Sequence, residues 1–558
     1  MTKNKTNFFL LVLITLVGLA LRFWKLDQFP VSLNWDEISH GYNAYSILTT
    51  GKDEWGMSWP LIFRAFGDFK LPVYIYLTVI SVFFFGLTAF AVRFISALAG
   101  TLAIPAIYLL AGQLFPGAKI TVGKKLSFDI GLAAAALLAI SPWHFFISRP
   151  TLEANLALTL IIYGAYFLFR GLQKPVFFLP ASLLLSLSLH TYNTARVFVP
   201  LLLVAYIVLY WRQIKVTFIT TLSLLVVIFA FGLVVNQVLV GTGTARYQKL
   251  AILSESAIFQ IGEDRARSRF PSVIARLIHN RPVYFTTTYF KNYFSYFSAP
   301  FFNQSHGVQT QFAIPNQNLF GIPVLFLAVI GFLLLIRSFF VGHHRFPILW
   351  LLASPAAAAA TADPPQALRP NPLIAAIILL SAYGLFRVTK WLATPFLLLF
   401  TVLTVILFVG YQRDYYGNYQ KAYSASWQYG NREAIEVITN NIDRYDRIIM
   451  TKRYGEPHIF YAFYSRLDPK LLMPGPDNIR FMKSDWYWTD KIGRVYFIND
   501  WQIGTGVVNT LPLESGGTIS TNNSLLITSP DHLPKNTTVI DKIDFLNGDP
   551  AFVIAKFN

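Results

Sequence analysis

Long hydrophobic stretches recur along the first three quarters of the chain, separated by short polar segments. A helix of about 20 hydrophobic residues spans the hydrocarbon core of a bilayer. The pattern therefore predicts eleven membrane-spanning helices, over residues 7–24, 90–114, 130–147, 152–169, 176–190, 197–211, 216–240, 319–336, 346–361, 372–386 and 392–410.

From about residue 412 the chain becomes polar, and short helix and strand patterns replace the long hydrophobic stretches. The periodicity predicts helices over 431–442 and 456–467, and strands over 445–451, 494–500, 524–530 and 551–557. We therefore expect a polytopic α-helical membrane protein with about 11 transmembrane helices, in which residues 1–411 form a transmembrane domain. Residues 412–558 are expected to form an extracytoplasmic α/β domain.

Composition supports a membrane protein, because 54% of the 558 residues are hydrophobic and only 13% are charged. A soluble globular protein of this length contains about 25% charged residues. The chain has no Cys, which excludes disulfides and thiolate metal sites and leaves the redox compartment undecided. The net charge of +18 raises the question of nucleic acid. However, Lys and Arg cluster in the short loops between spans, so we expect no nucleic-acid partner.

The positive-inside rule gives the topology. Lys3 and Lys5 predict a cytoplasmic N-terminus, and residues 1–24 lack a small-residue cleavage site, so they are expected to be a retained span. If 71–88 and 90–114 both crossed, the lysines near residue 120 would lie outside, so we expect 71–88 to lie along the interface. Residues 25–89 and 241–318 are then outer loops of a multi-pass plasma-membrane protein.

Several outer segments carry ionisable residues directly beside hydrophobic stretches. They are Asp36 with Glu37, Lys70, Arg93, Arg149 with Glu153, Arg196, and Asp363 with Arg369. Charges at membrane depth are costly unless they are paired or functional. Interfacial anchors and loop salt bridges would explain each one alone. Taken together, with bases slightly outnumbering acids, they favour a ligand with a phosphate head and a lipid tail.

The adjacent acids Asp36 and Glu37 have two explanations. A carboxylate beside phosphate-binding cations takes the proton from an incoming hydroxyl, while the cations stabilise charge on the departing phosphate oxygen. The alternative is a helix start, with Asn34 or Asp36 as N-cap and Glu37 in the first turn. The two are compatible. The catalytic explanation requires Asp36 and Lys70 to lie close together on the outer side.

The motifs of the N-terminal half resemble those of GT-C glycosyltransferases. They are WDE at 35–37, FKLPVYIYL at 69–77, FAVRFISALAGTLAIPAIYLLA at 90–111 and SPWHFFISRPTLEANL at 141–156. The most similar groups are the protein O-mannosyltransferases and the aminoarabinose transferases of lipid A, over residues 1 to about 240. The resemblance implies inverting transfer from a polyprenyl-phosphate sugar to a hydroxyl acceptor (lipid, glycan or protein) on the extracytoplasmic face.

The resemblance also implies roles for individual residues. Asp36 corresponds to the general base and Glu37 to its companion, while Lys70 and Arg93 correspond to donor-phosphate ligands. Two further phosphate-binding candidates are Arg149 and Arg196. Four substrate-binding candidates complete the set: Glu153, Tyr192, Asp363 and Arg369.

Two departures from the family limit the resemblance. Phe69 and Ser39 replace an acid and an arginine of the aminoarabinose transferases, which puts a divalent metal ion in doubt, although His144 and Glu153 are candidate ligands. The loop 241–318 is too short for the β-trefoil insert of the mannosyltransferases. Its aromatic segment, 281–302, suits either an interfacial belt or stacking on the donor. A transporter or flippase and a non-enzymatic scaffold of envelope assembly remain alternatives.

Overall fold

The computed structural model describes residues 2–122, 126–241, 251–305, 309–362 and 365–558. They form two compact units. The helical unit consists of Met1–Trp24 and Ser96–Gln412, and the mixed unit consists of Lys25–Ile95 and Arg413–Asn558. This grouping differs from the predicted division at residues 411 and 412, because the first outer loop folds with the C-terminal part of the chain. One reason is the buried ion pair between Glu54 and Arg480, at 2.8 Å.

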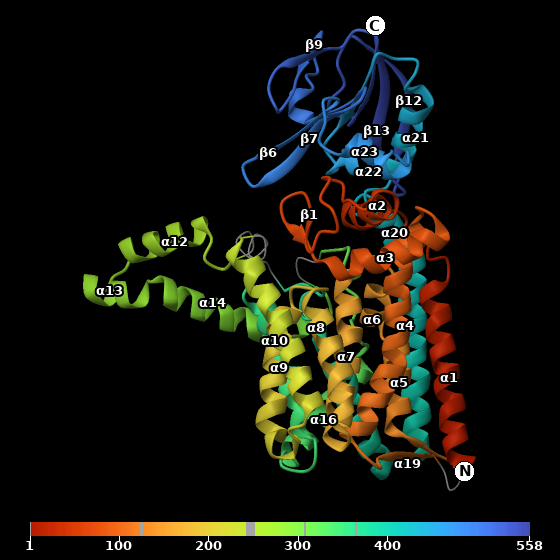
Figure 1. The fold of residues 1–558 in the computed structure, drawn as a ribbon, viewed down its shortest axis with the longest axis vertical. Coiled ribbons are helices and arrows are strands. Elements are labelled where there is room, and N and C mark those ends of the chain that lie inside the picture. Colours follow the sequence, from red (N-terminus) through yellow and green to blue (C-terminus); the bar gives the residue numbers. More distant parts are fainter. Residues whose placement is uncertain (1, 123–125, 242–250, 306–308, 363–364) are drawn as a thin grey trace. The chain divides into compact units, whose positions relative to one another are not determined.

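Seven helices of the described chain are long and hydrophobic enough to cross a membrane. Their hydrophobic segments are Lys5–Phe23, Ala89–Leu114, Glu153–Gln173, Ala195–Gln213, Phe218–Leu239, Pro372–Lys390 and Pro395–Ala422. Each coincides with a predicted span. The helices that contain all or most of each segment run alongside one another in Figure 1: α1 (Thr2–Phe23), α4 (Ala89–Leu114), α7 (Glu153–Gln173), α9 (Ala195–Tyr210), α10 (Phe218–Leu239) and α19 (Pro372–Tyr416). The last two predicted spans therefore lie within one helix, α19.

The other four predicted spans fall on shorter hydrophobic helices. They are α5 (Ile130–Ala139) with α6 (Pro142–Ile147), α8 (Phe178–Leu189), α16 (Ile322–Arg337), and α17 (Arg345–Ala353) with α18 (Ala356–Ala359). The predicted span 130–147 is interrupted because Ser141 caps a new helix and Pro142 occupies its first position. The fold class is confirmed, whereas helix length alone does not fix the number of crossings at eleven.

The segment 71–88 forms α3 (Pro72–Phe85), a helix of 14 residues. At 1.5 Å per residue it is about 21 Å long, shorter than the hydrocarbon core of about 30 Å. Gly86, with φ of 69°, ends it. Its length agrees with the prediction that this segment does not cross.

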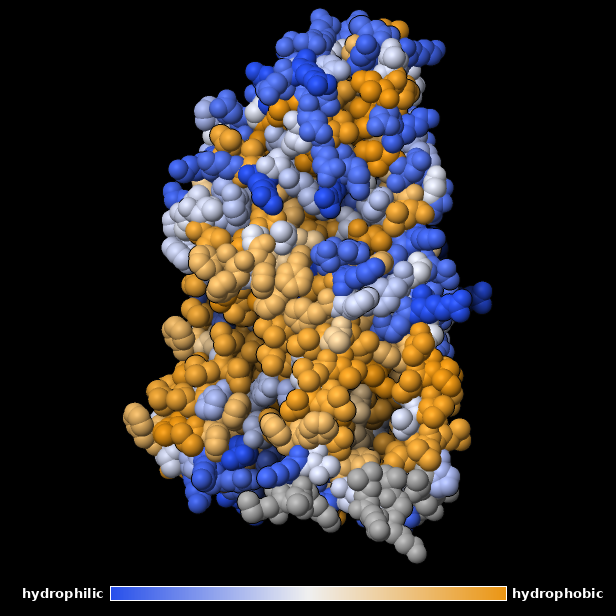
Figure 2. Space-filling view, turned by 90° about the vertical axis from the view of Figure 1, so that its right-hand side faces the viewer, coloured by the Kyte–Doolittle hydropathy of each residue, from blue (hydrophilic) through white to orange (hydrophobic). Residues whose placement is uncertain are grey.

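Hydrophobic side chains cover the outer face of the helical unit. Phe8 and Phe9 of α1 and Leu399 and Ile406 of α19 are more than half exposed. Figure 2 shows that hydrophobic residues cover most of the helical face turned toward the viewer. A continuous hydrophobic surface of this size suits contact with lipid.

The connections between the long helices contain further short elements. A hairpin of β3 (Lys119–Val122) and β4 (Leu126–Asp129) joins α4 to α5. The long loop contains α12 (Glu255–Ala266), α13 (Ser272–Ile278), α14 (Arg281–Ser295) and α15 (Ala299–Phe302).

The core of the mixed unit is a seven-stranded sheet in the order β12-β13-β11-β5-β8-β7-β6. Its strands are β5 (Arg447–Thr451), β6 (Asn478–Lys483), β7 (Trp486–Ile492), β8 (Val495–Ile498), β11 (Ser524–Thr528), β12 (Thr537–Asp544) and β13 (Pro550–Phe557). The central strand β5 pairs in parallel with β8 and β11, with Ile449 opposite Tyr496 and Leu526. The predicted strands are confirmed as β5, β8, β11 and β13, whereas β6, β7 and β12 were not predicted from the sequence.

Helices pack against this sheet and complete the hydrophobic core. The two predicted helices are confirmed as α21 (Asn431–Asn441) and α22 (Pro457–Tyr464). A third helix, α2 (Trp35–Thr50), contributes Ile38 and Tyr42 to the same core as Ile448 and Phe497. The remaining elements are β1 (Phe63–Arg64), β2 (Phe69–Lys70), α20 (Asn418–Ala422), α23 (Pro469–Leu472), β9 (Thr510–Pro512) and β10 (Thr518–Ser520). Packing of α2 on the sheet core fixes the position of its N-terminal acids within this unit.

Candidate active site

The start of α2 places Asp36 and Glu37 in different surroundings. Asn34 is the N-cap: its side chain accepts a hydrogen bond from the Glu37 backbone N–H at 3.0 Å, and the Glu37 carboxylate accepts one from the Asn34 N–H at 3.2 Å. This capping box confirms the helix start expected from the sequence. Successive helix residues point about 100° apart. The Asp36 side chain is accordingly 55% exposed, while that of Glu37 is 1% exposed.

A short β-hairpin brings Lys70 to Asp36. Strands β1 and β2 pair with Phe63 opposite Lys70, which directs the lysine toward the start of α2. Lys70 forms an ion pair with the Asp36 carboxylate, and its own side chain is nearly buried. One turn along α2, the His40 ring contacts the Asp36 carbonyl oxygen through Nδ1 at 2.7 Å. The expected proximity of Asp36 and Lys70 is therefore present, with the carboxylate facing solvent.

Glu37 is bound to Arg93 in a fully buried pair. Arg93 Nε lies 2.9 Å from Glu37 Oε1, and Nη2 lies 3.1 Å from Oε2. Arg93 also donates to the carbonyl oxygens of Leu26, Pro30 and Ser32. A guanidinium has five N–H donors, and these contacts use all of them. The predicted companion of Asp36 and the predicted phosphate ligand Arg93 therefore bind each other and the loop that leads into α2.

Arg149, in the helical unit, is buried and binds backbone carbonyls as Arg93 does in the mixed unit. It is fully buried, and it donates to the carbonyl oxygens of Leu21, Arg22 and Trp24. These carbonyls belong to the C-terminal end of α1, where orphan acceptors and the helix dipole favour a cation. The geometry thus gives Arg149 the role of a helix C-cap.

Other predicted residues converge where three segments of the helical unit meet. Glu153 begins α7, Tyr192 and Arg196 lie at the start of α9, and Arg369 precedes α19. The Thr194 hydroxyl donates to the Arg369 carbonyl at 3.1 Å, and the Asn371 amide donates to the Ala154 carbonyl at 2.5 Å. Side chains take part as well. Arg196 donates to the side chain of Gln237, and Arg369 donates to the Thr361 hydroxyl at 2.6 Å. Asp363 lies outside the described residues.

A hydrophobic groove of about 730 Å³ lies in the helical unit. Its lining includes Phe294, Phe297, Phe302, Phe326, Leu352 and Leu380. The predicted aromatic segment 281–302 therefore supplies part of its wall. The Asn292 amide, on the same helix as Phe294, donates to the Thr361 carbonyl at 2.9 Å, and Thr361 also accepts from Arg369. The helix that supplies Phe294 to the groove is therefore linked through Asn292 to Thr361, whose hydroxyl binds Arg369.

The mixed unit contains a buried ionisable cluster that was not predicted from the sequence. Arg480 pairs with Glu54 at 2.8 Å and stacks on Trp55 at 3.6 Å from the ring centre. Burial lowers the pKa of Arg480 and raises the pKa of Glu54. Glu456 accepts from the Trp486 indole N–H at 2.5 Å, and burial raises the pKa of Glu456 to about 7. The acids of KDEW, at 52–55, were a sequence signal that the first outer loop contributes to such a cluster. The partner of Glu54, Arg480, lies 426 residues away, so the sequence did not indicate the pair.

The raised pKa of Glu456 predicts a pH-dependent stability. Between pH 4.5 and about 7 the unfolded chain has lost this proton while the folded chain retains it, so stability falls as pH rises through that interval. A Glu456→Gln variant, whose amide oxygen still accepts from Trp486, is expected to remove this contribution. The measurement is melting temperature against pH. The wild type should lose more stability than the variant between pH 5 and 7, and parallel curves would contradict the assignment.

The positions of the described acids and histidines bear on the metal ion considered from the sequence. Within the described ranges, no three or more His, Asp or Glu side chains lie close enough together to hold a metal ion. At Asp36, the cation nearest the carboxylate is the Lys70 ammonium group. His144, a candidate ligand, instead contacts the buried Arg22 side chain through Nδ1 at 2.8 Å.

Comparison with solved structures identifies the fold. ArnT from Cupriavidus metallidurans bound to undecaprenyl phosphate aligns over 98% of this chain and 97% of its own, with 14% identity and a TM-score of 0.52. The Archaeoglobus fulgidus oligosaccharyltransferase, tethered with an acceptor peptide containing the NVT sequon, aligns over 83% of this chain and 63% of its own. That alignment has 14% identity and a TM-score of 0.50.

Sequence comparison gives no such match: no family model and no curated protein matches the chain. The structural likeness extends through the long helices and the C-terminal sheet, well beyond the 240 residues over which motifs resemble the family. The chain therefore has the fold of ArnT and of the archaeal oligosaccharyltransferase, and the resemblance predicted from its sequence is confirmed at the level of the fold.

Proposed function

We propose that this protein is an integral-membrane glycosyltransferase that moves a sugar from a polyprenyl-phosphate donor to a hydroxyl acceptor on the extracytoplasmic face. The observation that carries the proposal is the solvent-facing Asp36 carboxylate, held at a helix N-terminus against the nearly buried Lys70. The shared fold supports it, because ArnT was crystallised with undecaprenyl phosphate. The proposal includes a cytoplasmic N-terminus, a plasma-membrane location and an outer mixed unit.

The chemistry follows from the two side chains. Asp36 takes the proton of the acceptor hydroxyl as its oxygen attacks the anomeric carbon. The bond from that carbon to the phosphate oxygen breaks, and polyprenyl phosphate leaves with the electron pair. Attack from the opposite face inverts the anomeric configuration. Lys70 stabilises the negative charge that develops on the departing phosphate.

Glu37 and Arg93 support this site without touching substrate. Their buried pair and the carbonyl contacts of Arg93 fix the loop that ends at the Asn34 cap. A rigid loop holds Asp36 in one position, which is what a positioned base requires. Arg149 similarly fixes the end of α1. Within the mixed unit, Lys70 is the proposed ligand of the donor phosphate. Within the helical unit, Arg196 and Arg369 are the cations proposed to bind a lipid phosphate, with Glu153 and Tyr192 as substrate contacts.

The hydrophobic groove of the helical unit is a suitable site for the polyprenyl tail. Its aromatic and aliphatic lining excludes water, and the helix that carries Phe294 is linked through Asn292 and Thr361 to the cation Arg369. A lipid phosphate with its tail in this groove would meet that cation at the segment junction. The experiment that tests the function is release of polyprenyl phosphate from a panel of polyprenyl-phosphate sugars by the reconstituted protein.

The Arg369→Ala variant is expected to raise the KM for the donor about tenfold or more, with a smaller effect on kcat, because a charge-assisted contact to the phosphate is lost. Arg369→Lys should recover part of the affinity, since it keeps the charge but loses the planar fork. Steady-state kinetics in proteoliposomes measures both. Thr361→Val is the matched control, because it removes only the hydroxyl that Arg369 binds. Equal effects of Thr361→Val and Arg369→Ala on KM would assign Arg369 to loop structure instead.

A further inference from the structure

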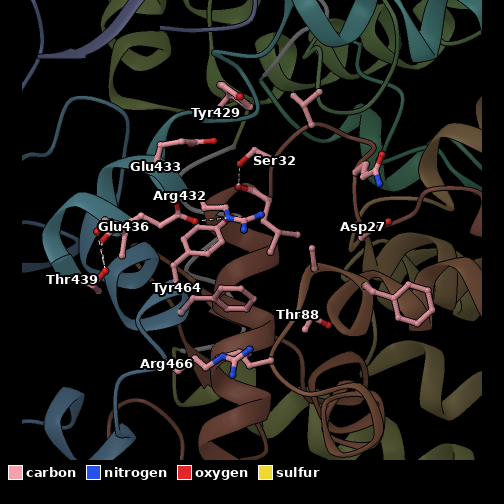
Figure 3. Close-up of a pocket in the computed structure, with 18 of the residues that line it drawn as sticks. Asp27, Ser32, Thr88, Tyr429, Arg432, Glu433, Glu436, Thr439, Tyr464 and Arg466 are labelled. Atoms are coloured by element: carbon pink, nitrogen blue, oxygen red, sulfur yellow. Dashed lines mark hydrogen bonds and ion pairs between the residues drawn. The ribbon is translucent and has the colours of Figure 1, made fainter. Parts of the chain in front are cut away.

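A cavity of about 960 Å³ lies in the mixed unit, apart from the Asp36 carboxylate. Its walls come from residues 27–33, the turn between α3 and α4, and helices α21 and α22 (Figure 3). Ser32 and Leu33 in its wall directly precede the Asn34 cap of α2. A molecule bound here therefore contacts the segment that positions the proposed base.

One wall of the cavity is polar. Arg432, Glu433, Glu436 and Thr439 follow one another along α21, and Arg432 Nε pairs with Glu436 Oε1 at 3.0 Å. Figure 3 shows Glu433 extending from α21 toward the loop that carries Ser32. Its Oε2 atom is inaccessible to solvent and has no hydrogen-bond partner among the described residues. Because Glu433 lines the cavity, its carboxylate offers an acceptor to a ligand that donates a hydrogen bond.

Two tyrosines border the same wall. Tyr429 and Tyr464 both line the cavity, and the Glu433 charge raises the pKa of each, although burial is the larger cause. The pKa of Tyr464 rises to about 12. Both phenols therefore remain protonated at neutral pH and offer O–H donors beside aromatic faces. Aromatic faces combined with carboxylates and hydroxyls suit the mixed apolar and hydroxylated surface of a sugar.

The turn between α3 and α4 supplies most of the hydrophobic lining, and exposed aromatic residues adjoin it. Phe85, Leu87 and Phe90 line the cavity there. The adjacent Phe83 and Phe84, at the end of α3, are 66% and 70% exposed. Exposed aromatic residues of this kind are typical of a membrane interface. The cavity thus has polar residues of α21 on one part of its lining, and exposed aromatic residues suited to lipid lie beside another part.

The charged residues that line the cavity indicate whether a bound lipid would have a charged or a neutral head group. Three acids line it, Asp27, Glu433 and Glu436, against two bases, Arg432 and Arg466. A phosphate here would meet more negative than positive charge, which disfavours it. A neutral polyol can instead donate to the carboxylates and accept from the guanidinium groups.

We propose that this cavity binds the sugar head group of a neutral glycolipid, with the lipid part leaving along the aromatic edge. The assignment rests on the proposed function and deepens it, because it names a membrane-bound glycan as the acceptor class. The cavity holds the part of the acceptor remote from the reacting hydroxyl, since Asp36 is not among its lining residues. Glu433 is here a binding residue rather than a catalytic one.

The test is native mass spectrometry of the full-length protein with three lipids that share the same acyl chains. The probes are monoglucosyl diacylglycerol, phosphatidylglycerol and diacylglycerol. The glucosyl lipid is expected to bind at least fivefold better than the other two. Glu433→Gln should weaken it about tenfold, because it replaces a charged acceptor by a neutral one. Glu263→Gln, on the exposed Arg267–Glu263 pair of α12, is the matched control and should leave binding unchanged.

The outcomes separate this proposal from the proposed function. Preferential binding of phosphatidylglycerol, equal retention of the three lipids, or full binding by a Glu433→Gln variant with the wild-type melting temperature would each overturn the glycolipid site. Asp36→Asn should bind the glucosyl lipid as the wild type does while losing turnover. A wild type that binds the glucosyl lipid but releases no polyprenyl phosphate from any donor would sustain the site and overturn the transferase.

Discussion

The Asp36→Asn variant is expected to transfer sugar about 1,000-fold more slowly than the wild type while remaining folded, within the range that general bases contribute. Asn has nearly the same size as Asp, and its amide oxygen still accepts a hydrogen bond from Lys70. The capping box at the helix start involves Asn34 and Glu37, so the substitution leaves it intact. What is lost is a basic oxygen that takes the proton of the attacking hydroxyl. The measurement is polyprenyl phosphate release, with product formation, under single-turnover conditions in proteoliposomes.

A matched control separates this effect from a general change in charge. Asp443 is an exposed carboxylate of the same unit, in the connection between α21 and β5. Asp443→Asn makes the same chemical change and should retain the wild-type rate. If both variants retain full turnover, Asp36 is not the base. If both lose it equally, the loss does not come from proton transfer at Asp36.

The sequence analysis expected Asp36 and Lys70 to lie close together because the catalytic explanation requires it. The capping pattern predicted the start of α2, whereas the hairpin of β1 and β2 that brings Lys70 to it was not predicted. Both residues also stand in motifs that resemble one family. The hydrophobic pattern also predicted the long helices, because a helix that crosses a membrane requires a continuous hydrophobic stretch.

The roles of the buried cations could not be predicted from the sequence. Arg93 and Arg149 donate to several backbone carbonyls, whose positions depend on loop conformation rather than on side-chain identity. A sequence shows an arginine near the membrane edge in either case. It does not show whether the arginine faces a ligand or the turn of another segment.

Contacts between distant residues were missed for a different reason. Arg480 lies on β6, a strand whose alternation is weak because most of its residues are only half-buried. Its partner Glu54 belongs to the first outer loop, so neither residue predicts the other. The same separation explains why residues 25–95 were assigned to the transmembrane domain. Their packing partners are the sheet and helices formed more than 300 residues later.

Single substitutions in the Glu37–Arg93 pair are expected to destabilise the mixed unit by about 3–5 kcal/mol, because each leaves an uncompensated buried charge. Arg93→Met should cost more than Glu37→Gln, since it also orphans the carbonyls of Leu26, Pro30 and Ser32. In the Glu37→Met/Arg93→Met double variant the loss should be smaller than the sum of the Glu37→Met and Arg93→Met losses. Melting temperatures of the purified variants measure all of these effects. An Arg93→Met protein with the wild-type melting temperature and weakened donor binding would instead restore Arg93 as a phosphate ligand, because only a residue that is dispensable for the loop is available to a substrate.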